Sequence, residues 1–309
     1  MPSLDTSDDQ CYTSLALIRN VFHSCREVVI VMKKIGIVYH PMIEAAYSLA
    51  KKLEEFLSSS GVSVWLCSAW EGEEARDKVD GTELILSVGG DGTILRAVQA
   101  VFPHPIPIAG VNLGKLGFMT ELSADEALAK LPALLAGEGW IDERATLEVE
   151  LLPVEKAGSP RIFYALNDVV VARGAIARMV YIEASVNDEP LTTYKADGVI
   201  VATATGSTGY SLSAGGPVLH PQANEFLLLP IVPHLCSAHT LVLPSTAVVK
   251  LRISSAHQAI LSVDGHINLP LPDGAVVTVK SGSNKARFLR IRPRNSFYGS
   301  LGKKLKGKS

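Results

Sequence analysis

The feature that most constrains this fold is a glycine-rich segment between an apolar run and an amphipathic run. We expect Glu83–Val88 to form a strand and Ile94–Val101 to form a helix, with Gly89-Gly90-Asp91-Gly92-Thr93 as the turn between them. Glycine permits positive φ and lets a ligand approach the backbone closely. Consecutive N–H groups at the start of a helix attract an anion such as phosphate. The segment therefore predicts an α/β unit in which Gly89, Gly90 and Thr93 bind phosphate.

Segments on both sides of this turn continue the alternation of strand and helix. Further strands are expected at Ile35–Tyr39, Val62–Leu66 and Ile106–Val111. Apolar residues at helical spacing predict one helix that ends at Gly61, and a capping box of Ser123 and Glu126 predicts a second helix, Ala124–Leu135. Strands that alternate with helices pair in parallel through crossover connections. We expect an α/β domain with a parallel sheet over residues 33–140.

The pattern changes near residue 140 to short runs that are rich in β-forming residues. These runs are Thr146–Leu152, Ile162–Ala172, Val180–Val186, Leu191–Tyr194, Val199–Ala202, Val248–Ile253, Ile260–Val263, Ala275–Val279 and Arg287–Ile291. Turn residues such as Asn187-Asp188 and Asp273-Gly274 separate several of them. We therefore expect an all-β domain over residues 141–285, either a sandwich or an irregular stack.

The two ends of the chain are expected to lie outside these domains. Residues 1–32 show weak patterning and are interpreted as an N-terminal extension. In the C-terminal segment, residues 286–309, the strand Arg287–Ile291 could return to the first sheet. The basic tail that follows is expected to be solvated and frayed; its lysines are Lys303, Lys304, Lys306 and Lys308.

Composition excludes several classes of function. The net charge of −2 lacks the surplus of Lys and Arg with which general nucleic-acid-binding proteins contact phosphates. The N-terminus is acidic where a signal peptide would be basic, and no apolar run reaches the roughly 18 residues that span a bilayer. The 4 cysteines show no C-x-x-C spacing, which gives no support to a zinc site or a redox pair. We expect a cytoplasmic protein without nucleic-acid or membrane partners.

Asp91 is the residue of the glycine-rich turn that turn geometry does not explain. A carboxylate inside an anion site raises the electrostatic cost of binding phosphate. Its presence makes chemical sense if it handles a proton or a metal ion. We therefore take Asp91 as the candidate catalytic group.

Three further segments carry candidate binding residues. Asn112–Thr120 is a glycine-containing loop at the end of a strand, where open α/β sheets bind ligands, although a sharp turn with Phe118 in the core fits equally well. Asn167-Asp168 offers hydrogen bonds to a ribose or a base, or simply ends strand pairing. In Asp197–Pro217 an apolar strand leads into small and hydroxylated residues around Tyr210. These residues are expected to bury little surface and to admit a flat polar ligand that stacks on Tyr210, the alternative being a disordered linker.

Together these four motifs resemble those of the bacterial-type NAD kinase family, the polyphosphate/ATP-NAD kinases. Two shorter segments, Pro230–His234 and Ser262–Gly265, match as well, so that the similarity spans about residues 33–295. The glycine-rich turn alone is similar to a signature of lipid kinases and, loosely, of phosphofructokinases, which lack a counterpart of Asp197–Pro217. The resemblance implies an α/β domain, a β-rich domain, a C-terminal segment that returns to the first domain, and a homodimer or homotetramer.

The resemblance also implies roles for individual residues. It places the catalytic acid at Asp91. It places substrate contacts at Gly92, Arg96, Asn167, Asp168, Arg178, Lys195, Asp197, Thr208, Gly209, Tyr210, Ser211, Leu212 and Ser213. The chain departs from the family pattern at Gly209, where Ala is usual, at His266, where Gln is usual, and at His239-Thr240, where Arg-Pro is usual.

The implied activity is phosphoryl transfer from ATP or polyphosphate to the 2′-hydroxyl of the adenosine ribose of NAD, which forms NADP. Such a transfer depends on positioning and charge neutralisation more than on covalent chemistry. A divalent cation, Mg²⁺, is expected to bridge the donor phosphates, and the sequence shows no dedicated metal cage. Two alternatives stay open: a lipid kinase, which the polar segment Thr203–Gly216 disfavours, and a non-catalytic NAD-sensing module, which Asp91 disfavours.

Overall fold

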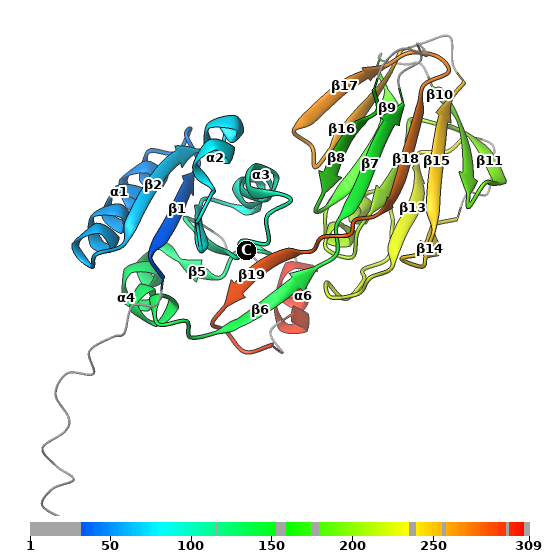
Figure 1. Ribbon diagram of the computed structural model, residues 1–309. Coiled ribbons are helices and arrows are strands. Elements are labelled where there is room, and N and C mark those ends of the chain that lie inside the picture. The colour runs from blue at the N-terminus through cyan, green and yellow to red at the C-terminus, as the bar shows by residue number, and fades with distance from the viewer. Residues whose placement is uncertain are drawn as a thin grey trace, which may run out of the picture.

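The computed structural model has an α/β part and a β part that lie side by side (Figure 1). It describes residues 32–114, 117–152, 159–174, 179–234, 239–254, 258–294 and 297–305. The strands of the α/β part are β1 (Lys34–Tyr39), β2 (Ser63–Ser68), β3 (Leu84–Val88), β4 (Ile108–Asn112), β5 (Leu122–Ser123), β6 (Trp140–Arg144) and β19 (Ala286–Arg290). Its helices are α1 (Glu44–Ser59), α2 (Gly72–Lys78), α3 (Asp91–Val101) and α4 (Ala124–Leu135).

The strands of the α/β part form one seven-stranded sheet in the order β2-β1-β3-β4-β19-β6, with β5 beside β4. Strands β1 to β4 pair in parallel, because a helix crosses back along the sheet between consecutive strands. β3 and β4 are apolar and buried along their whole length, as central strands covered on both faces require. The carboxyl ends of β1, β3 and β4 therefore share one edge, and the glycine-rich turn follows β3 at that edge.

The β part consists of two antiparallel sheets packed face to face. The first has the order β11-β10-β15-β18-β7-β8 and the second β14-β13-β12-β9-β16-β17. The strands of the first are β7 (Leu147–Leu152), β8 (Arg161–Ala165), β10 (Val180–Val186), β11 (Glu189–Ala196), β15 (Val248–Ile253) and β18 (Val276–Ser281). Those of the second are β9 (Asp168–Arg173), β12 (Gly198–Ala202), β13 (Phe226–Ile231), β14 (Leu241–Leu243), β16 (Ala259–Val263) and β17 (Ile267–Leu271). Val149, Leu251 and Val277 of the first sheet share one core with Val171 and Leu261 of the second.

Two adjacent strands connect the two parts. β19 lies parallel to β4 and antiparallel to β6, so the chain leaves the first sheet after β6 and comes back to it with β19 (Figure 1). The predicted fold class is confirmed, including the return of the C-terminal segment to the first sheet. The boundary expected after residue 140 falls inside β6.

The predictions that rest on capping and turn residues are confirmed. The Ser123 N–H donates to the Glu126 carboxylate at 3.1 Å, and the capping box opens α4 where it was predicted. Asn187 and Asp188 have φ values of 53° and 66°, as a two-residue hairpin turn between β10 and β11 requires.

Other elements differ from the expectation for physical reasons. The expected strand over residues 162–172 is interrupted, because β8 ends at Ala165 and β9 begins at Asp168. α3 begins at Asp91, three residues earlier than expected, so the glycine-rich turn supplies its first turn. α2 was not expected, since Ala75 is its only buried residue and it shows no apolar periodicity.

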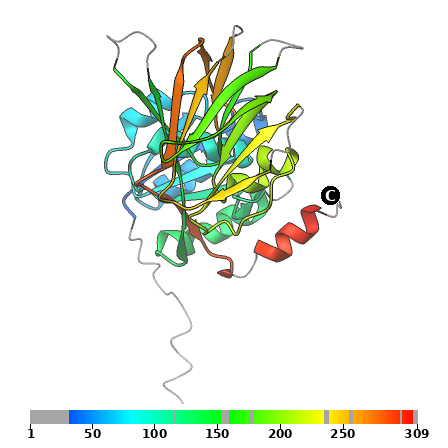
Figure 2. The same ribbon diagram turned by 90° about the vertical axis from the view of Figure 1, so that its right-hand side faces the viewer.

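The C-terminal tail is partly helical. Helix α6 (Phe297–Leu305) lies outside the sheets, at one side of the molecule (Figure 2). The rings of Phe297 and His220 meet edge to face with centroids 5.4 Å apart. The expectation of a frayed tail is wrong for Lys303 and Lys304, which belong to α6, while the other two tail lysines and residues 1–31 lie outside the described residues.

Gly36 in β1 tests how tightly the first sheet is packed. A side chain at Gly36 would overlap the Trp65 indole and approach Ile85 Cδ1 at 2.7 Å. Overpacking of this kind costs about 1–3 kcal/mol, so Gly36→Ala should lower the free energy of unfolding by that amount, measured by urea denaturation. Gly72→Ala, where the new methyl group meets open space, is the matched control and should unfold like the wild type. Equal destabilisation of the two variants would contradict the packing argument.

Candidate functional site

The glycine-rich turn and the loop after β4 meet at Asp91. The two carboxylate oxygens of Asp91 accept hydrogen bonds from the backbone N–H groups of Phe118 (2.9 Å) and Met119 (3.1 Å). A side chain at Gly117 would overlap this carboxylate, so the close approach requires glycine there. Phe118 is partly exposed rather than fully buried in the core. The loop expected to bind a ligand is therefore fixed against the candidate catalytic acid.

The glycine-rich turn leaves open space at the start of α3. Among the glycines of this turn, Gly89 alone has positive φ (158°). A side chain at Gly89 would overlap Thr93, whose hydroxyl group is buried without a hydrogen-bond partner among the described residues. A side chain at Gly90 or Gly92 would meet nothing within 4 Å. A ligand phosphate therefore has room at this helix N-terminus, where the helix dipole favours negative charge.

A buried carboxylate, Asp264, sets the geometry of the Asn167-Asp168 pair. Asp264 lies in the turn between β16 and β17 and accepts hydrogen bonds from the N–H groups of Leu166 (2.9 Å), Asn167 (2.7 Å) and Asp168 (3.2 Å). The Asp264 N–H in turn donates to the carbonyl oxygen of Asp168 at 2.9 Å. These bonds satisfy the backbone N–H groups of the short segment that separates β8 from β9. The sequence showed Asp264 only as part of a matching motif and gave no sign of this role.

Burial moves Asp168 and Asp264 toward their protonated forms. Burial first, and then the charge of Asp264, raise the pKa of Asp168 to about 7. Burial also raises the pKa of Asp264, although hydrogen bonds from Leu166 and Asn167 oppose that change. Near neutral pH, Asp168 can therefore donate a hydrogen bond as well as accept one. This versatility suits a ligand with both hydroxyl and ring-nitrogen groups.

Asn167 and Asp168 lie in the wall of a cavity of about 470 Å³. The other residues that line it are Val170, Ala172, Arg173, Tyr210, Ile260, Ser262, Asp264, Gly265 and Asn268. Tyr210 is 47% exposed, so its ring can serve as a stacking face. The Oδ1 atom of Asn167 is buried and has no hydrogen-bond partner among the described residues. The cavity thus offers an aromatic face and an unused polar acceptor, as a site for a nucleoside would.

The small-residue loop after β12 is more buried than expected. Thr203 and Ser211 are 1% and 0% exposed. The Thr203 hydroxyl donates to the Leu166 carbonyl at 2.6 Å, and a side chain at Gly206 would overlap the backbone of Asn167. The expectation that this loop buries little surface is wrong, because small residues let its backbone pack directly against the segment between β8 and β9.

The predicted ligand-wrapping residues form two short helical turns, η1 (Gly206–Thr208) and α5 (Tyr210–Ser213), joined at Gly209. Gly209 has a φ of −97°, and an added Cβ would lie 3.2 Å from the nearest atom, the Gly206 carbonyl oxygen. The Ala that is usual in the resembling family would therefore fit after a small shift. Leu212 is half-buried and Ser213 is exposed.

Two predicted basic residues contact other side chains of the protein. The Arg96 guanidinium lies over the Trp70 ring, 4.3 Å from its centroid, on the second turn of α3. Lys195 Nζ lies 5.6 Å from the centroid of the Tyr181 ring. A third, Arg178, lies outside the described residues.

Asp197 is connected to the cavity by an ion pair with Arg173, a residue that the sequence analysis did not single out. Its carboxylate pairs with Arg173 at 3.1 Å, and Arg173 lines the cavity. His266 lies in the turn after Asp264, where its Nδ1 atom is 3.0 Å from the Asp264 carbonyl oxygen. Strand β9 thus presents both Asp168 and Arg173 to the same cavity.

Helix α3 links the candidate acid to the cavity. Gln99, two turns after Asp91, donates to Asp264 Oδ2 at 3.2 Å and also bonds to the carbonyl oxygen of Tyr164. The eight residues from Asp91 to Gln99 span about 12 Å of helix axis. One rigid element therefore fixes the distance between the two halves of the site. A glutamine on an amphipathic helix carries no sequence signal for such a contact.

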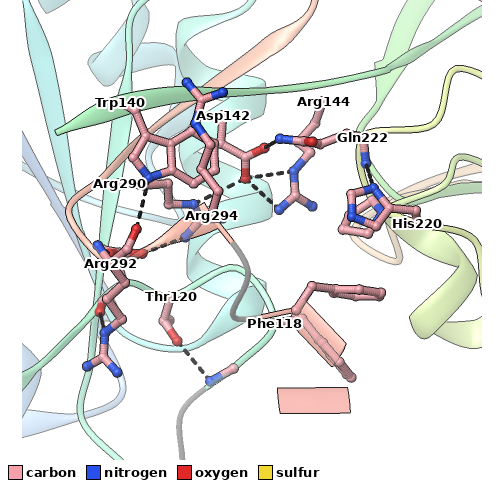
Figure 3. Close-up of a pocket in the computed structure, with 14 residues that line it drawn as sticks. Phe118, Thr120, Trp140, Asp142, Arg144, His220, Gln222, Arg290, Arg292 and Arg294 are labelled. Atoms are coloured by element: carbon pink, nitrogen blue, oxygen red, sulfur yellow. Dashed lines mark hydrogen bonds and ion pairs between the residues drawn. The ribbon is translucent and has the colours of Figure 1, made fainter. Parts of the chain in front are cut away.

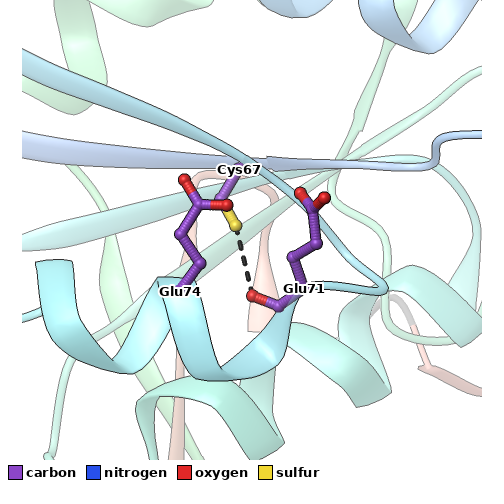
Figure 4. Close-up of side chains that lie close together, drawn as sticks. All are labelled: Cys67, Glu71 and Glu74. Carbon is purple, nitrogen blue, oxygen red and sulfur yellow. Dashed lines mark hydrogen bonds between the residues drawn. The ribbon is translucent and has the colours of Figure 1, made fainter.

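Cys67, Glu71 and Glu74 gather at the end of β2 and the start of α2 (Figure 4). The Cys67 thiol donates to the backbone carbonyl of Glu71 at 3.3 Å. Burial first, and then the Glu74 charge, raise the pKa of this thiol to about 11. Glu74 is paired with Lys78. Because a metal ligand must be a thiolate, these contacts make the cluster a poor metal site.

Two family models match the chain. The model of the ATP-NAD kinase N-terminal domain matches residues 70–139, and that of the ATP-NAD kinase C-terminal domain matches residues 166–291. An NAD kinase of Dehalococcoides mccartyi is 52% identical over 275 residues, which are 89% of this chain and 96% of that protein. An NAD kinase of Chloroflexus aurantiacus is 39% identical over 270 residues, which are 87% of this chain and 97% of that protein.

Solved structures of related folds carry bound nucleotides. Yeast NADH kinase in complex with NADH superposes with a TM-score of 0.76 at 26% identity, covering 90% of this chain and 89% of that one. An NAD kinase from Archaeoglobus fulgidus in complex with ATP superposes with a TM-score of 0.72 at 27% identity, covering 89% of this chain and 100% of that one.

The raised pKa of Asp168 predicts a pH dependence of stability. The folded state holds a proton on Asp168 up to a pH of about 7, whereas an unfolded Asp loses it near about 4. The free energy of unfolding should therefore fall as pH rises from about 4 to about 7. Asp168→Asn cannot titrate, so it should gain stability relative to the wild type over this range, by up to a few kcal/mol.

Urea denaturation at a series of pH values measures this difference. Asp80→Asn, which removes the same charge from an exposed turn, is the control and should follow the wild type. Parallel curves for Asp168→Asn and the wild type would show that burial does not hold the proton on Asp168.

Proposed function

The chain belongs to the NAD kinase family, and we propose that it transfers a phosphoryl group from ATP or polyphosphate to the 2′-hydroxyl of the adenosine ribose of NAD, forming NADP. The observation that carries this proposal is the placement of Asp91. Its carboxylate stands at the open N-terminus of α3, the helix that also contacts Asp264 in the wall of the Asn167-Asp168 cavity. A proton acceptor, a phosphate site and a nucleoside cavity thus share one rigid element.

Asp91 accepts the proton of the 2′-hydroxyl while the hydroxyl oxygen attacks the terminal phosphorus of the donor. The O–P bond forms as the bond to the leaving phosphate breaks, and ADP or a shortened polyphosphate departs. An ionised carboxylate offers about four lone-pair sites. Phe118 and Met119 occupy one on each oxygen and so hold the carboxylate in one orientation with capacity to spare. A base fixed in this way needs no reorganisation as the proton moves.

The cavity binds the adenosine portion of NAD. The free acceptor of Asn167 and the carboxyl group of Asp168 bind its polar groups, and Tyr210 stacks on a base. Gly92 leaves space for the ribose beside Asp91. Further contacts to NAD are assigned by resemblance to Arg96, Arg178, Lys195, Asp197, Thr208, Gly209, Ser211, Leu212 and Ser213.

The donor phosphates bind at the N-terminus of α3, at Gly89, Gly90 and Thr93. Mg²⁺ usually binds through one or two carboxylates together with substrate phosphates and water. Asp91 is the carboxylate at this position, and both of its oxygens already accept N–H groups. We therefore assign most ligands of the cation to the donor phosphates and water. When bound, the cation would neutralise negative charge on the donor phosphates.

The assembly proposed is a homodimer or homotetramer. Edge strands β11 and β14 carry exposed apolar residues, Leu191 (41% exposed) and Val242 (52% exposed), which suit a contact between copies of the chain.

Among the described helices, none is long and apolar enough to cross a membrane. Action in the cytoplasm is proposed on the basis of the sequence composition.

One assay tests the activity against its alternatives. The purified chain is incubated with NAD, ATP and Mg²⁺, and NADP is detected with an NADP-specific dehydrogenase. Replacing ATP with polyphosphate tests the donor, and replacing NAD with diacylglycerol tests a lipid kinase. Formation of NADP is the expected result. Binding of NAD without turnover would identify a sensor instead, and a phosphorylated lipid would identify a lipid kinase.

Asp91→Asn separates proton transfer from binding. Loss of a general base typically lowers the rate by about 10² to 10⁴, and we expect kcat for NADP formation to fall by that factor. The amide can accept only one of the two N–H groups, so a modest loss of stability, about 0.5–1.5 kcal/mol, should accompany it. NAD affinity, measured by calorimetry, should stay within a few fold of the wild type.

Asp125→Asn is the matched control, because Asp125 is an exposed acid in the first turn of another helix, α4. It should keep the wild-type kcat. If Asp91→Asn keeps more than about a tenth of the wild-type kcat, Asp91 positions the loop and the proton leaves by another route.

A further inference from the structure

A second cavity, of about 100 Å³, lies where the α/β part meets the β part (Figure 3). Its walls come from the loop after β4, from β6, from the residues at and after the end of β19, and from the segment His220–Gln222. Phe297 at the start of α6 closes one side. None of the residues assigned above to NAD or the donor lines this cavity.

Arginine dominates the lining of this cavity. Arg144, Arg290, Arg292 and Arg294 line it, against the carboxylates of Glu121 and Asp142 and the imidazole of His220. Outside the lining, Glu126 pairs with Arg292 at 2.9 Å. Each of these three acids therefore has an arginine partner, and Arg294 remains without an acidic partner among the described residues. The cavity carries an excess of positive charge.

The innermost arginines are held rigidly and keep unused donors. Asp142 Oδ2 accepts hydrogen bonds from Arg144 Nη2 (2.6 Å) and Arg290 Nε (3.2 Å), as Figure 3 shows. Burial alone would raise the pKa of Asp142, but the hydrogen bond and charge of Arg144 and the charge of Arg290 hold it below its usual value. In the described part of the chain, Arg290 Nη2 has no acceptor, and Arg144 Nη1 has only Thr205 Oγ1 at 3.4 Å.

Neutralising Asp142 and Glu121 would not require this arrangement. Three arginines would suffice for these two acids and Glu126, whereas four line the cavity, and the side chains of the innermost two are only 7–8% exposed. Guanidinium donors that face a cavity without an acceptor favour a negatively charged group there. The exposed residues His220 and Arg294 at the margin give a solute access to the interior. The surplus of guanidinium donors in the lining therefore points to an anionic occupant.

We propose that this cavity binds a small phosphate-class oxyanion. Pockets for drug-sized ligands measure about 300–1,000 Å³, so a cavity of this size excludes a nucleoside and admits a phosphate group. The planar fork of guanidinium donors matches phosphate oxygens in pairs. The phosphate can be free orthophosphate or diphosphate, or the end of a phosphate chain carried by the donor.

The cavity shares a wall with the catalytic loop. Gly117 and Phe118 line it, and the Phe118 N–H donates to Asp91. An oxyanion in the cavity thus contacts the loop that orients the candidate base. With this cavity occupied, the loop that contains Gly117 and Phe118 would have an oxyanion on one side and the proposed donor-phosphate site at the start of α3 on the other.

Arg294→Gln tests the site in the full chain. Arg294 is exposed, and its one described contact is with the Trp140 ring, 4.8 Å away, so the variant should fold with the wild-type melting temperature. Calorimetry with orthophosphate and with diphosphate, without NAD or ATP, measures affinity independently of turnover. Loss of one charged donor should weaken binding by about tenfold or more. Arg252→Gln, which removes an exposed arginine from β15, is the control and should bind like the wild type.

The KM for ATP and for polyphosphate distinguishes the two sources of phosphate. If free phosphate is the occupant, Arg294→Gln weakens only orthophosphate and diphosphate binding. If the donor chain reaches the cavity, the KM for that donor rises as well. Equal phosphate affinity in the wild type, Arg294→Gln and Arg252→Gln, with unchanged KM values, would overturn the proposal and leave the NAD kinase assay unaffected.

Discussion

The carboxylate of Asp264 is the constraint on which the candidate site depends. A buried acid is unfavourable unless hydrogen bonds satisfy it, and here three consecutive backbone N–H groups and the Gln99 amide do so. Those donors come from the segment between β8 and β9 and from α3. One side chain therefore fixes both the cavity wall and the helix that begins at Asp91. Without it, the N–H groups of Leu166, Asn167 and Asp168 would lose a shared acceptor in the interior.

Close approach between backbone and polar groups builds the rest of the site. The Asp91 carboxylate reaches the loop after β4 only because position 117 has no side chain, and the turn at Gly206 reaches Asn167 for the same reason. These contacts hold the loop after β4 and the turn at Gly206 in place. The glycines at positions 117 and 206 are therefore required by contacts within the protein, independently of any ligand.

Sequence alone predicts those features that depend on neighbouring residues. The capping box at Ser123 and the turn at Asn187-Asp188 are local, and both are found where they were expected. The alternation of strands and helices is local as well, although the short helix α2 was not expected. The Asp264–Leu166 contact joins residues 98 positions apart, and that between Arg290 and Asp142 spans 148. No local periodicity reports such polar contacts. The resemblance named Asp91, Asn167 and Asp168, but not the buried groups that hold them.

The insertion of β19 between β4 and β6 governs the order in which the molecule is completed during synthesis. Among the described strands, β6 pairs only with β19 in this sheet, and β19 emerges from the ribosome after the whole β part. Until then the part of β4 around Ile108, which pairs with Phe288 of β19, presents an unpaired edge, and such an edge is a template for association with other chains. The half of the protein that is translated first is thus the half that is finished last. The nascent chain must pass through a stage in which its α/β sheet is open.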